Sequence, residues 1–143
     1  MNTKLRYGII GTGHMGIEHI RNILLMDDAE VASCADPDAG SRDQARALLP
    51  ASIEIHSDYS AVLEDPSIDA IVIATPNHTH ARVLDDVFRT SKNVLCEKPL
   101  ATTFEDALAV EAAAAKHGGL FWVGMEYRYM PPVAQYVRDV HAG

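Results

Sequence analysis

The sequence has little of what marks a secreted, membrane-spanning or nucleic-acid-binding protein. Only two of its 143 residues are cysteines, Cys34 and Cys96, and they form no CxxC pair. Both lie in apolar runs, so we expect two buried thiols in a reducing compartment rather than a disulfide. No apolar run approaches the roughly 20 residues of a membrane-spanning helix, and residues 1–6 lack the apolar core of a signal peptide. These absences predict a cytoplasmic protein with no membrane partner.

Positive charge is also scarce. The chain has 12 Lys and Arg residues against 20 Asp and Glu residues, which gives a formal net charge of −8. Such a surface repels a phosphate backbone at long range, so we expect no nucleic-acid partner. A small anionic ligand can still bind, because backbone N–H groups hold anions independently of net charge.

Short apolar runs alternate with longer amphipathic stretches along the whole chain, a pattern typical of a parallel sheet covered by helices. The apolar runs predict strands at 7–10 (entered from residue 5), 30–35, 53–55, 70–74, 93–96 and 120–123. The amphipathic stretches predict helices at about 15–26, 41–49, 58–63, 80–89, 103–116 and 132–141. The alternation indicates one α/β domain over residues 1–143. We expect a doubly wound Rossmann sheet in the order 3-2-1-4-5-6, with right-handed crossovers and helix layers on both faces.

A glycine-rich loop stands between the first predicted strand and the first predicted helix. It is a G-x-G-x-x-G sequence made of Gly11, Thr12, Gly13, His14, Met15 and Gly16. In a dinucleotide-binding loop the first glycine permits the tight turn and the second admits the pyrophosphate. The third lets helix and strand pack closely. The alternative, a plain glycine-rich turn, does not account for the strand-to-helix setting.

An acidic residue follows at the spacing that such a loop requires. Asp36 ends the second predicted strand, 20 residues after Gly16. A carboxylate at this point accepts hydrogen bonds from ribose hydroxyls and repels a 2′-phosphate, so NAD is the expected cofactor. Asp36 with Pro37 is also a common turn signal, and Arg42 is close enough in sequence to contact a 2′-phosphate, which leaves NADP as an alternative.

Two further loops carry a more specific resemblance. The chain resembles the Gfo/Idh/MocA oxidoreductases, which comprise glucose–fructose oxidoreductases, inositol dehydrogenases and rhizopine-catabolism proteins. The matching segments occur in the family's order and span the whole chain. They are the glycine loop, Ala35-Asp36-Pro37, Thr75-Pro76-Asn77-His78-Thr79-His80, Cys96-Glu97-Lys98-Pro99-Leu100 and Tyr127-Arg128-Tyr129-Met130-Pro131.

The resemblance implies a role for each loop position. It places Thr75, Pro76 and Asn77 along the nicotinamide-ribose side of the cleft, and His80 near the cofactor at the start of the following helix. It places Glu97 at the nicotinamide end.

The same resemblance places Lys98 beside the reacting carbon–oxygen bond of the substrate and lets Arg128 face the same cleft. Chemistry supports the assignment of Lys98. Oxidation of an alcohol by hydride transfer develops alkoxide character, which a fixed ammonium stabilises while relaying the proton. Without its loop, Lys98 would be taken for a solvated surface lysine.

The histidines and one helix end need separate interpretation. His78 and His80 suggest a metal site, but no acidic or cysteine ligand accompanies them at a recognisable spacing, so we expect none. His14 and His19 are interpreted as structural residues of the loop and first helix. Ser91 stands where the family usually has a glycine that ends the helix. A left-handed residue is expected at this position, and serine adopts that conformation less readily than glycine, so we expect a modest local loss of stability.

The resemblance also implies a second α/β domain, which supplies further catalytic residues, most substrate contacts and the homo-oligomer interface. The chain is expected to be the cofactor domain alone, so it should bind a dinucleotide but turn over little of its small-molecule substrate, a sugar, polyol or related compound. A non-catalytic NAD(H) sensor and a methyltransferase using S-adenosylmethionine are the alternatives. A sensor does not need Lys98, and a methyltransferase does not need the loops at 75–80 and 97–99.

Overall fold

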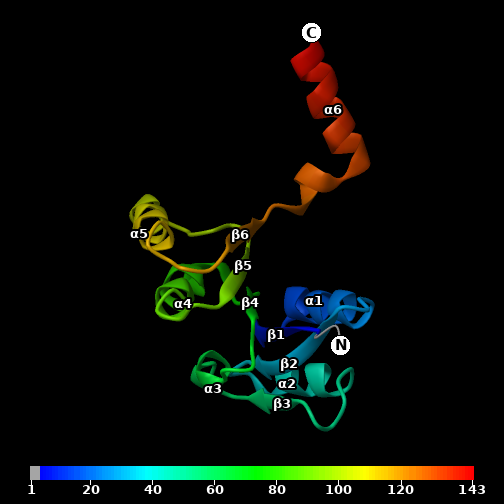
Figure 1. The fold of residues 1–143 in the computed structure, drawn as a ribbon, viewed down its shortest axis with the longest axis vertical. Coiled ribbons are helices and arrows are strands. Elements are labelled where there is room, and N and C mark those ends of the chain that lie inside the picture. Colours follow the sequence, from blue (N-terminus) through cyan, green and yellow to red (C-terminus); the bar gives the residue numbers. More distant parts are fainter. Residues whose placement is uncertain (1–3) are drawn as a thin grey trace.

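The protein is an open parallel sheet with helices on both faces (Figure 1). The structure is a computed structural model, and it describes residues 4–143. The strands are β1 (Leu5–Ile10), β2 (Ala29–Ala35), β3 (Glu54–His56), β4 (Ala70–Ile73), β5 (Asn93–Glu97) and β6 (Phe121–Gly124). They pair in parallel in the order β3-β2-β1-β4-β5-β6. The predicted fold class and strand order are confirmed.

Five helices connect successive strands and a sixth follows β6. They are α1 (His14–Leu24), α2 (Ala39–Arg46), α3 (Ser60–Glu64), α4 (His80–Val87), α5 (Phe104–Ala114) and α6 (Pro131–Ala142). Two short 3₁₀ turns, η1 (Asn77–Thr79) and η2 (Glu126–Tyr129), precede α4 and α6. Among residues 4–143, no helix is both long enough and apolar enough to cross a bilayer.

Successive residues of the central strands point to opposite faces of the sheet, and this alternation divides the core in two. Ile9 and Val72 pack with α1 and α2 on one face. Ile10 and Ile73 pack with α3, α4 and α5 on the other. All four residues of β4 are buried, as expected for a central parallel strand covered on both faces. The carboxyl edge of the sheet is thereby held rigidly from both sides.

The two cysteines belong to these cores. Cys34 lies on β2 and Cys96 on β5, and both are free thiols with no exposed surface. Burial raises the pKa of Cys34 to about 12, and burial with the nearby Glu97 charge raises that of Cys96 to about 12. The prediction of buried thiols is confirmed.

Several helix ends differ from the sequence prediction. α2 begins two residues earlier than expected because the Asp38 carboxylate accepts the Ser41 N–H at 2.7 Å and caps the helix. α1 ends at Leu24 and not near Met26. Local hydrogen bonds of this kind decide a helix end but leave little trace in the apolar periodicity.

The expectation of a left-handed residue at Ser91 is wrong. α4 ends at Val87, and among the described residues every positive φ belongs to a glycine. The Thr90 hydroxyl donates to the Val87 carbonyl at 2.7 Å and accepts the Lys92 N–H at 3.2 Å. This hydroxyl gives the Val87 carbonyl at the end of α4 a hydrogen-bond partner without a left-handed residue, so the predicted strain does not arise.

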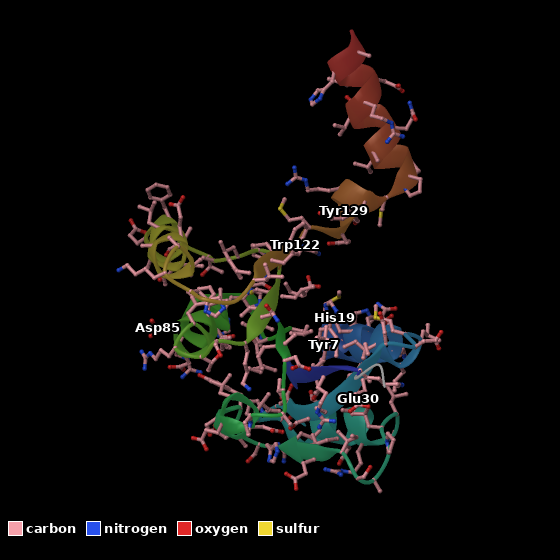
Figure 2. All side chains as sticks on the ribbon, viewed as in Figure 1. Tyr7, His19, Glu30, Asp85, Trp122 and Tyr129 are labelled. Atoms are coloured by element: carbon pink, nitrogen blue, oxygen red, sulfur yellow. The ribbon has the colours of Figure 1, made fainter. Side chains whose placement is uncertain are left out.

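The last helix stands away from the sheet. None of the residues of α6 is buried, and Figure 1 shows the helix projecting beyond β6. Large apolar side chains are exposed along this end of the molecule, among them Trp122 and Tyr129, whose ring centroids lie 6.0 Å apart (Figure 2).

Candidate functional site

The glycine loop leaves β1 and enters α1 at the carboxyl edge of the sheet. Gly11 has a φ of 92°, and a Cβ on it would lie 2.6 Å from the Ala74 carbonyl oxygen. A Cβ on Gly16 would lie 2.0 Å from the Gly11 carbonyl oxygen. Both positions therefore require glycine, the first for the turn and the second for the close approach of helix and strand.

The middle glycine has the opposite surroundings. A Cβ on Gly13 would meet no atom within 4 Å, so this face of the loop is open. Gly13 is the N-cap of α1, and no side chain caps the helix or supplies an acidic group in its first turn. The first N–H groups of a helix have no intrahelical acceptor and carry the positive end of its dipole. The open face and these N–H groups together are suited to holding an anion.

Asp36 fixes the neighbouring corner of the site. Its Oδ2 accepts the Thr12 N–H at 2.7 Å, and its Oδ1 accepts the Asp38 N–H at 2.9 Å. Two backbone bonds hold the carboxylate in place and tie the glycine loop to the end of β2. Each oxygen keeps a second lone pair, so the group can still accept a hydroxyl hydrogen.

The Arg42 guanidinium is held by backbone carbonyl oxygens of the loop after β2. It donates to the carbonyl oxygens of Asp36 at 2.8 Å and Pro37 at 2.9 Å. Asp38 and Ser41 line the cleft at this end, beside Asp36 and Pro37. Hydrogen bonds from the Ser41 N–H and hydroxyl hold the pKa of Asp38 below its ordinary value, so this carboxylate adds a second negative charge. Arg42 itself is not among the residues that line this cleft.

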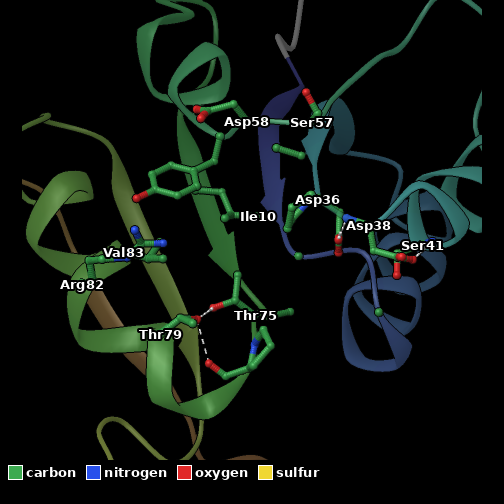
Figure 3. A pocket seen from close by; sticks show the side chains of 17 residues that line it. Ile10, Asp36, Asp38, Ser41, Ser57, Asp58, Thr75, Thr79, Arg82 and Val83 are labelled. Carbon is green, nitrogen blue, oxygen red and sulfur yellow. Dashed lines mark hydrogen bonds between the residues drawn. The ribbon is translucent and has the colours of Figure 1, made fainter.

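A cleft of about 540 Å³ runs along the carboxyl edge from β2 past β1 to β4 (Figure 3). Six residues singled out from the sequence line it: Gly11, Gly13, Asp36, Pro37, Thr75 and Pro76. Asp58 and Arg82, labelled across the cleft from Asp36 in Figure 3, also line it, together with Tyr59. Sequence reasoning missed these three residues because no local motif marks them.

Tyr59 closes the cleft on the α3 side. Its hydroxyl donates to the Asp86 carboxylate at 2.7 Å. Burial and this hydrogen bond raise the pKa of Tyr59 to about 12, so the phenol stays protonated. The ring presents an apolar wall and its polar tip is already satisfied.

The loop after β4 is braced from within. The Thr79 hydroxyl lies 2.7 Å from both the Thr75 hydroxyl and the Pro76 carbonyl oxygen. His80 has no exposed surface, and its ring nitrogens lie 2.9 Å from the Thr75 carbonyl oxygen and 2.8 Å from that of Pro99. His80 therefore links the loop after β4 to the loop after β5 from inside the protein. It has no exposed surface with which to contact a ligand. Asn77 is exposed in η1 and is not among the residues lining the cleft.

The loop after β5 lies beyond this cleft at the same edge. Glu97 is buried at the end of β5, and its Oε1 lies 2.8 Å from Nε2 of His19 on α1. Its Oε2 accepts the Lys98 N–H at 3.2 Å. The sequence assigned His19 only a structural place in the first helix, because a contact between residues 78 positions apart leaves no local signal.

Lys98 points toward η2. Its Nζ lies 3.8 Å from the Glu126 carboxylate, and both side chains are about half exposed. Arg128 is exposed on the same turn. The described part of the chain thus places Glu97, Lys98 and Arg128 at the β5–β6 end of the carboxyl edge. The residues around Asp36 lie at the β2 end of the same edge.

No group of three or more potential metal ligands is gathered within residues 4–143.

Comparison with known proteins identifies the family of the chain. Residues 5–125 match the family described as an oxidoreductase family with an NAD-binding Rossmann fold. Inositol 2-dehydrogenase 2 of Paenarthrobacter aurescens is 38% identical over 133 residues, which cover 89% of this chain and 39% of that protein. The rhizopine catabolism protein MocA of Rhizobium meliloti is 31% identical over 141 residues, covering 99% of this chain and 44% of that protein.

Solved structures show the same architecture. The myo-inositol dehydrogenase of Lactobacillus casei, crystallised with NAD(H) and myo-inositol, superposes with a TM-score of 0.90 at 27% identity. The match covers 99% of this chain and 42% of that one. The chain thus spans about two-fifths of the length of the relatives it matches.

Proposed function

The chain belongs to the Gfo/Idh/MocA oxidoreductase family, and from that premise we propose that it is the cofactor-binding part of an NAD-dependent dehydrogenase. The whole protein would transfer hydride between nicotinamide and a hydroxyl or carbonyl carbon of a sugar, polyol or related compound. The observation that carries the proposal is the open face at Gly13 beside the uncapped start of α1. Asp36, fixed at the neighbouring corner, completes a site for a diphosphate attached to an adenosine ribose.

In this proposal the N–H groups of residues 13–16 hold the pyrophosphate. Asp36 accepts the ribose hydroxyls, and with Asp38 it disfavours a 2′-phosphate through like charge. Thr75 and Pro76 border the second ribose. The bound nicotinamide would supply the hydride-accepting carbon, and this chain's residues would bind and orient it.

We propose Lys98 as the catalytic residue of this chain. It follows β5 at the edge where the nicotinamide half of the ligand would extend, and its ammonium is exposed enough to meet a substrate. There it would hold a positive charge against the oxygen that loses its proton. Glu126, 3.8 Å from Lys98 Nζ, would keep that ammonium near the β5–β6 end until substrate enters.

A second domain is proposed to complete the substrate site. The exposed apolar side chains of β6, η2 and α6 support this proposal, because a surface of this kind ordinarily lies against another protein surface. These 143 residues should accordingly bind NAD(H) but catalyse little turnover, and the homo-oligomer would form through the second domain.

Ligand titration tests the proposal. The chain is titrated with NADH, NADPH and S-adenosylmethionine, followed by nicotinamide fluorescence and by heat. We expect NADH to bind, NADPH to bind at least about tenfold more weakly, and S-adenosylmethionine not to compete. Preferential binding of S-adenosylmethionine would refute the proposal, and so would an absence of NADH binding.

A companion assay tests Lys98 in the full-length enzyme. Lys98→Ala should reduce turnover by about a hundredfold or more, the usual scale for a proton-transfer group, while NADH affinity changes little. Unchanged turnover would remove Lys98 from the mechanism.

A further inference from the structure

A buried contact joins the helix after the glycine loop to the strand that carries Lys98. His19 lies on α1, the helix that follows β1, and Glu97 is the last residue of β5, which is separated from β1 in the sheet by β4. Nε2 of His19 lies 2.8 Å from Oε1 of Glu97, and the side chains are 20% and 9% exposed. An ionised Glu97 carboxylate would only accept hydrogen bonds, and Nε2 of His19 would then be the donor of this contact.

Glu97 is confined from three sides. His19 holds Oε1, and the Lys98 N–H donates to Oε2 at 3.2 Å. Gly124 pairs with Glu97 across β5 and β6, and a Cβ there would lie 3.3 Å from Oε1. The carboxylate is thus held by contacts from α1, from β6 and from the backbone of the Lys98 loop.

We propose that His19 is a positioning residue. It holds the Glu97 carboxylate, and through Glu97 it fixes the start of the Lys98 loop relative to α1, the helix that binds the diphosphate. This inference rests on the proposed function for the identity of the ligand. Asp36 marks the adenosine end of the cleft, so the nicotinamide end extends past β4 toward β5. Loss of the His19 contact should therefore affect the nicotinamide half of the ligand and leave the adenosine half unchanged.

A comparison of two ligands separates this role from a general effect on folding. NADH contains the nicotinamide riboside half, whereas ADP-ribose has the adenosine and diphosphate without the ring. His19→Leu removes the donor, and His19→Gln keeps a donor that can reach the carboxylate. Arg21→Gln is the matched control, because Arg21 is an exposed residue of the same helix and lies outside the site.

We expect His19→Leu to weaken NADH binding about tenfold, which corresponds to the loss of one hydrogen bond to a charged group. Its affinity for ADP-ribose should stay within about twofold of the parent. His19→Gln should recover most of the NADH affinity, and Arg21→Gln should leave both ligands unaffected. Equal weakening of NADH and ADP-ribose, or no weakening of NADH, would overturn the inference.

A ligand-free measurement keeps this inference separate from the proposed function. In nitrogen–proton correlation spectra, the Lys98 amide should shift, and its exchange with solvent should accelerate, in His19→Leu but not in Arg21→Gln. An unmoved Lys98 amide would show that His19 does not position the loop, whether or not NADH binds. Failure of the parent chain to bind NADH would refute the proposed function alone.

Discussion

Two glycines of the loop before α1 lie in opposite surroundings although they are three residues apart. Gly13 faces open space and Gly16 presses on the backbone of Gly11. A methyl group added at each position separates the effect on ligand binding from the effect on folding.

Gly13→Ala should lower the free energy of unfolding by no more than about 1 kcal/mol, the difference between Gly and Ala at an N-cap. It should weaken NADH binding about tenfold or more, because the methyl group occupies the side from which the diphosphate approaches. Gly16→Ala should destabilise the fold by about 3 kcal/mol or more through backbone overlap. Denaturant unfolding and NADH titration check both. A Gly13→Ala chain that bound NADH normally would place the ligand elsewhere.

The two core thiols should be unreactive in the native state. Burial raises the pKa values of Cys34 and Cys96 to about 12, and only the thiolate reacts readily with disulfide reagents. We expect neither cysteine to react within minutes in buffer, and both to react in guanidinium chloride. Rapid modification of one thiol in buffer would mean that its face of the sheet opens.

For single residues, the sequence is informative where the residue's place depends on the local backbone. The three glycines and Asp36 were found by spacing, since a turn, a close approach and a strand end are local features. The sequence also predicts His19 on the first helix and His80 at the start of the following helix, and both lie there. Their hydrogen-bond partners come from other segments of the chain and leave no local signal. His19 contacts Glu97, and His80 is buried between Thr75 and Pro99.

Among the elements, α5 shows a sequence signal that the structure confirms. The sequence predicts a helix from about residue 103, and the Thr103 hydroxyl caps that helix by accepting the Asp106 N–H at 3.1 Å. Thr103→Ala should therefore cost about 1 kcal/mol of unfolding free energy. Thr102→Ala is the control, because Thr102 lies outside the helix and does not cap it. Equal effects of the two substitutions would contradict the capping role.

Other element boundaries could not be predicted from periodicity. The early start of α2 depends on one carboxylate, Asp38, and the end of α4 depends on one hydroxyl, that of Thr90. The strand order was predicted because strand–helix alternation and right-handed crossovers leave few arrangements for a parallel sheet.

For the molecule as a whole, α6 is the helix with the least packing against the rest of the described residues. A 12-residue helix with no buried residue has little tertiary packing to stabilise it, and isolated helices of this length are marginal in water. We expect the amides of α6 to exchange with deuterium nearly as fast as an unfolded chain, and those of β1 and β4 to be the slowest. Strong protection of α6 in a dilute sample would indicate that its apolar face is covered.

The two outermost strands of the sheet limit how another copy of the chain could associate with this one. β3 has three residues and β6 has four, so each open edge offers few unpaired N–H and C=O groups. Cross-strand addition of another chain would gain few hydrogen bonds at either edge. Self-association at high concentration would instead bring side chains of α6 together, and the amide I infrared band would show no growth of intermolecular β-structure.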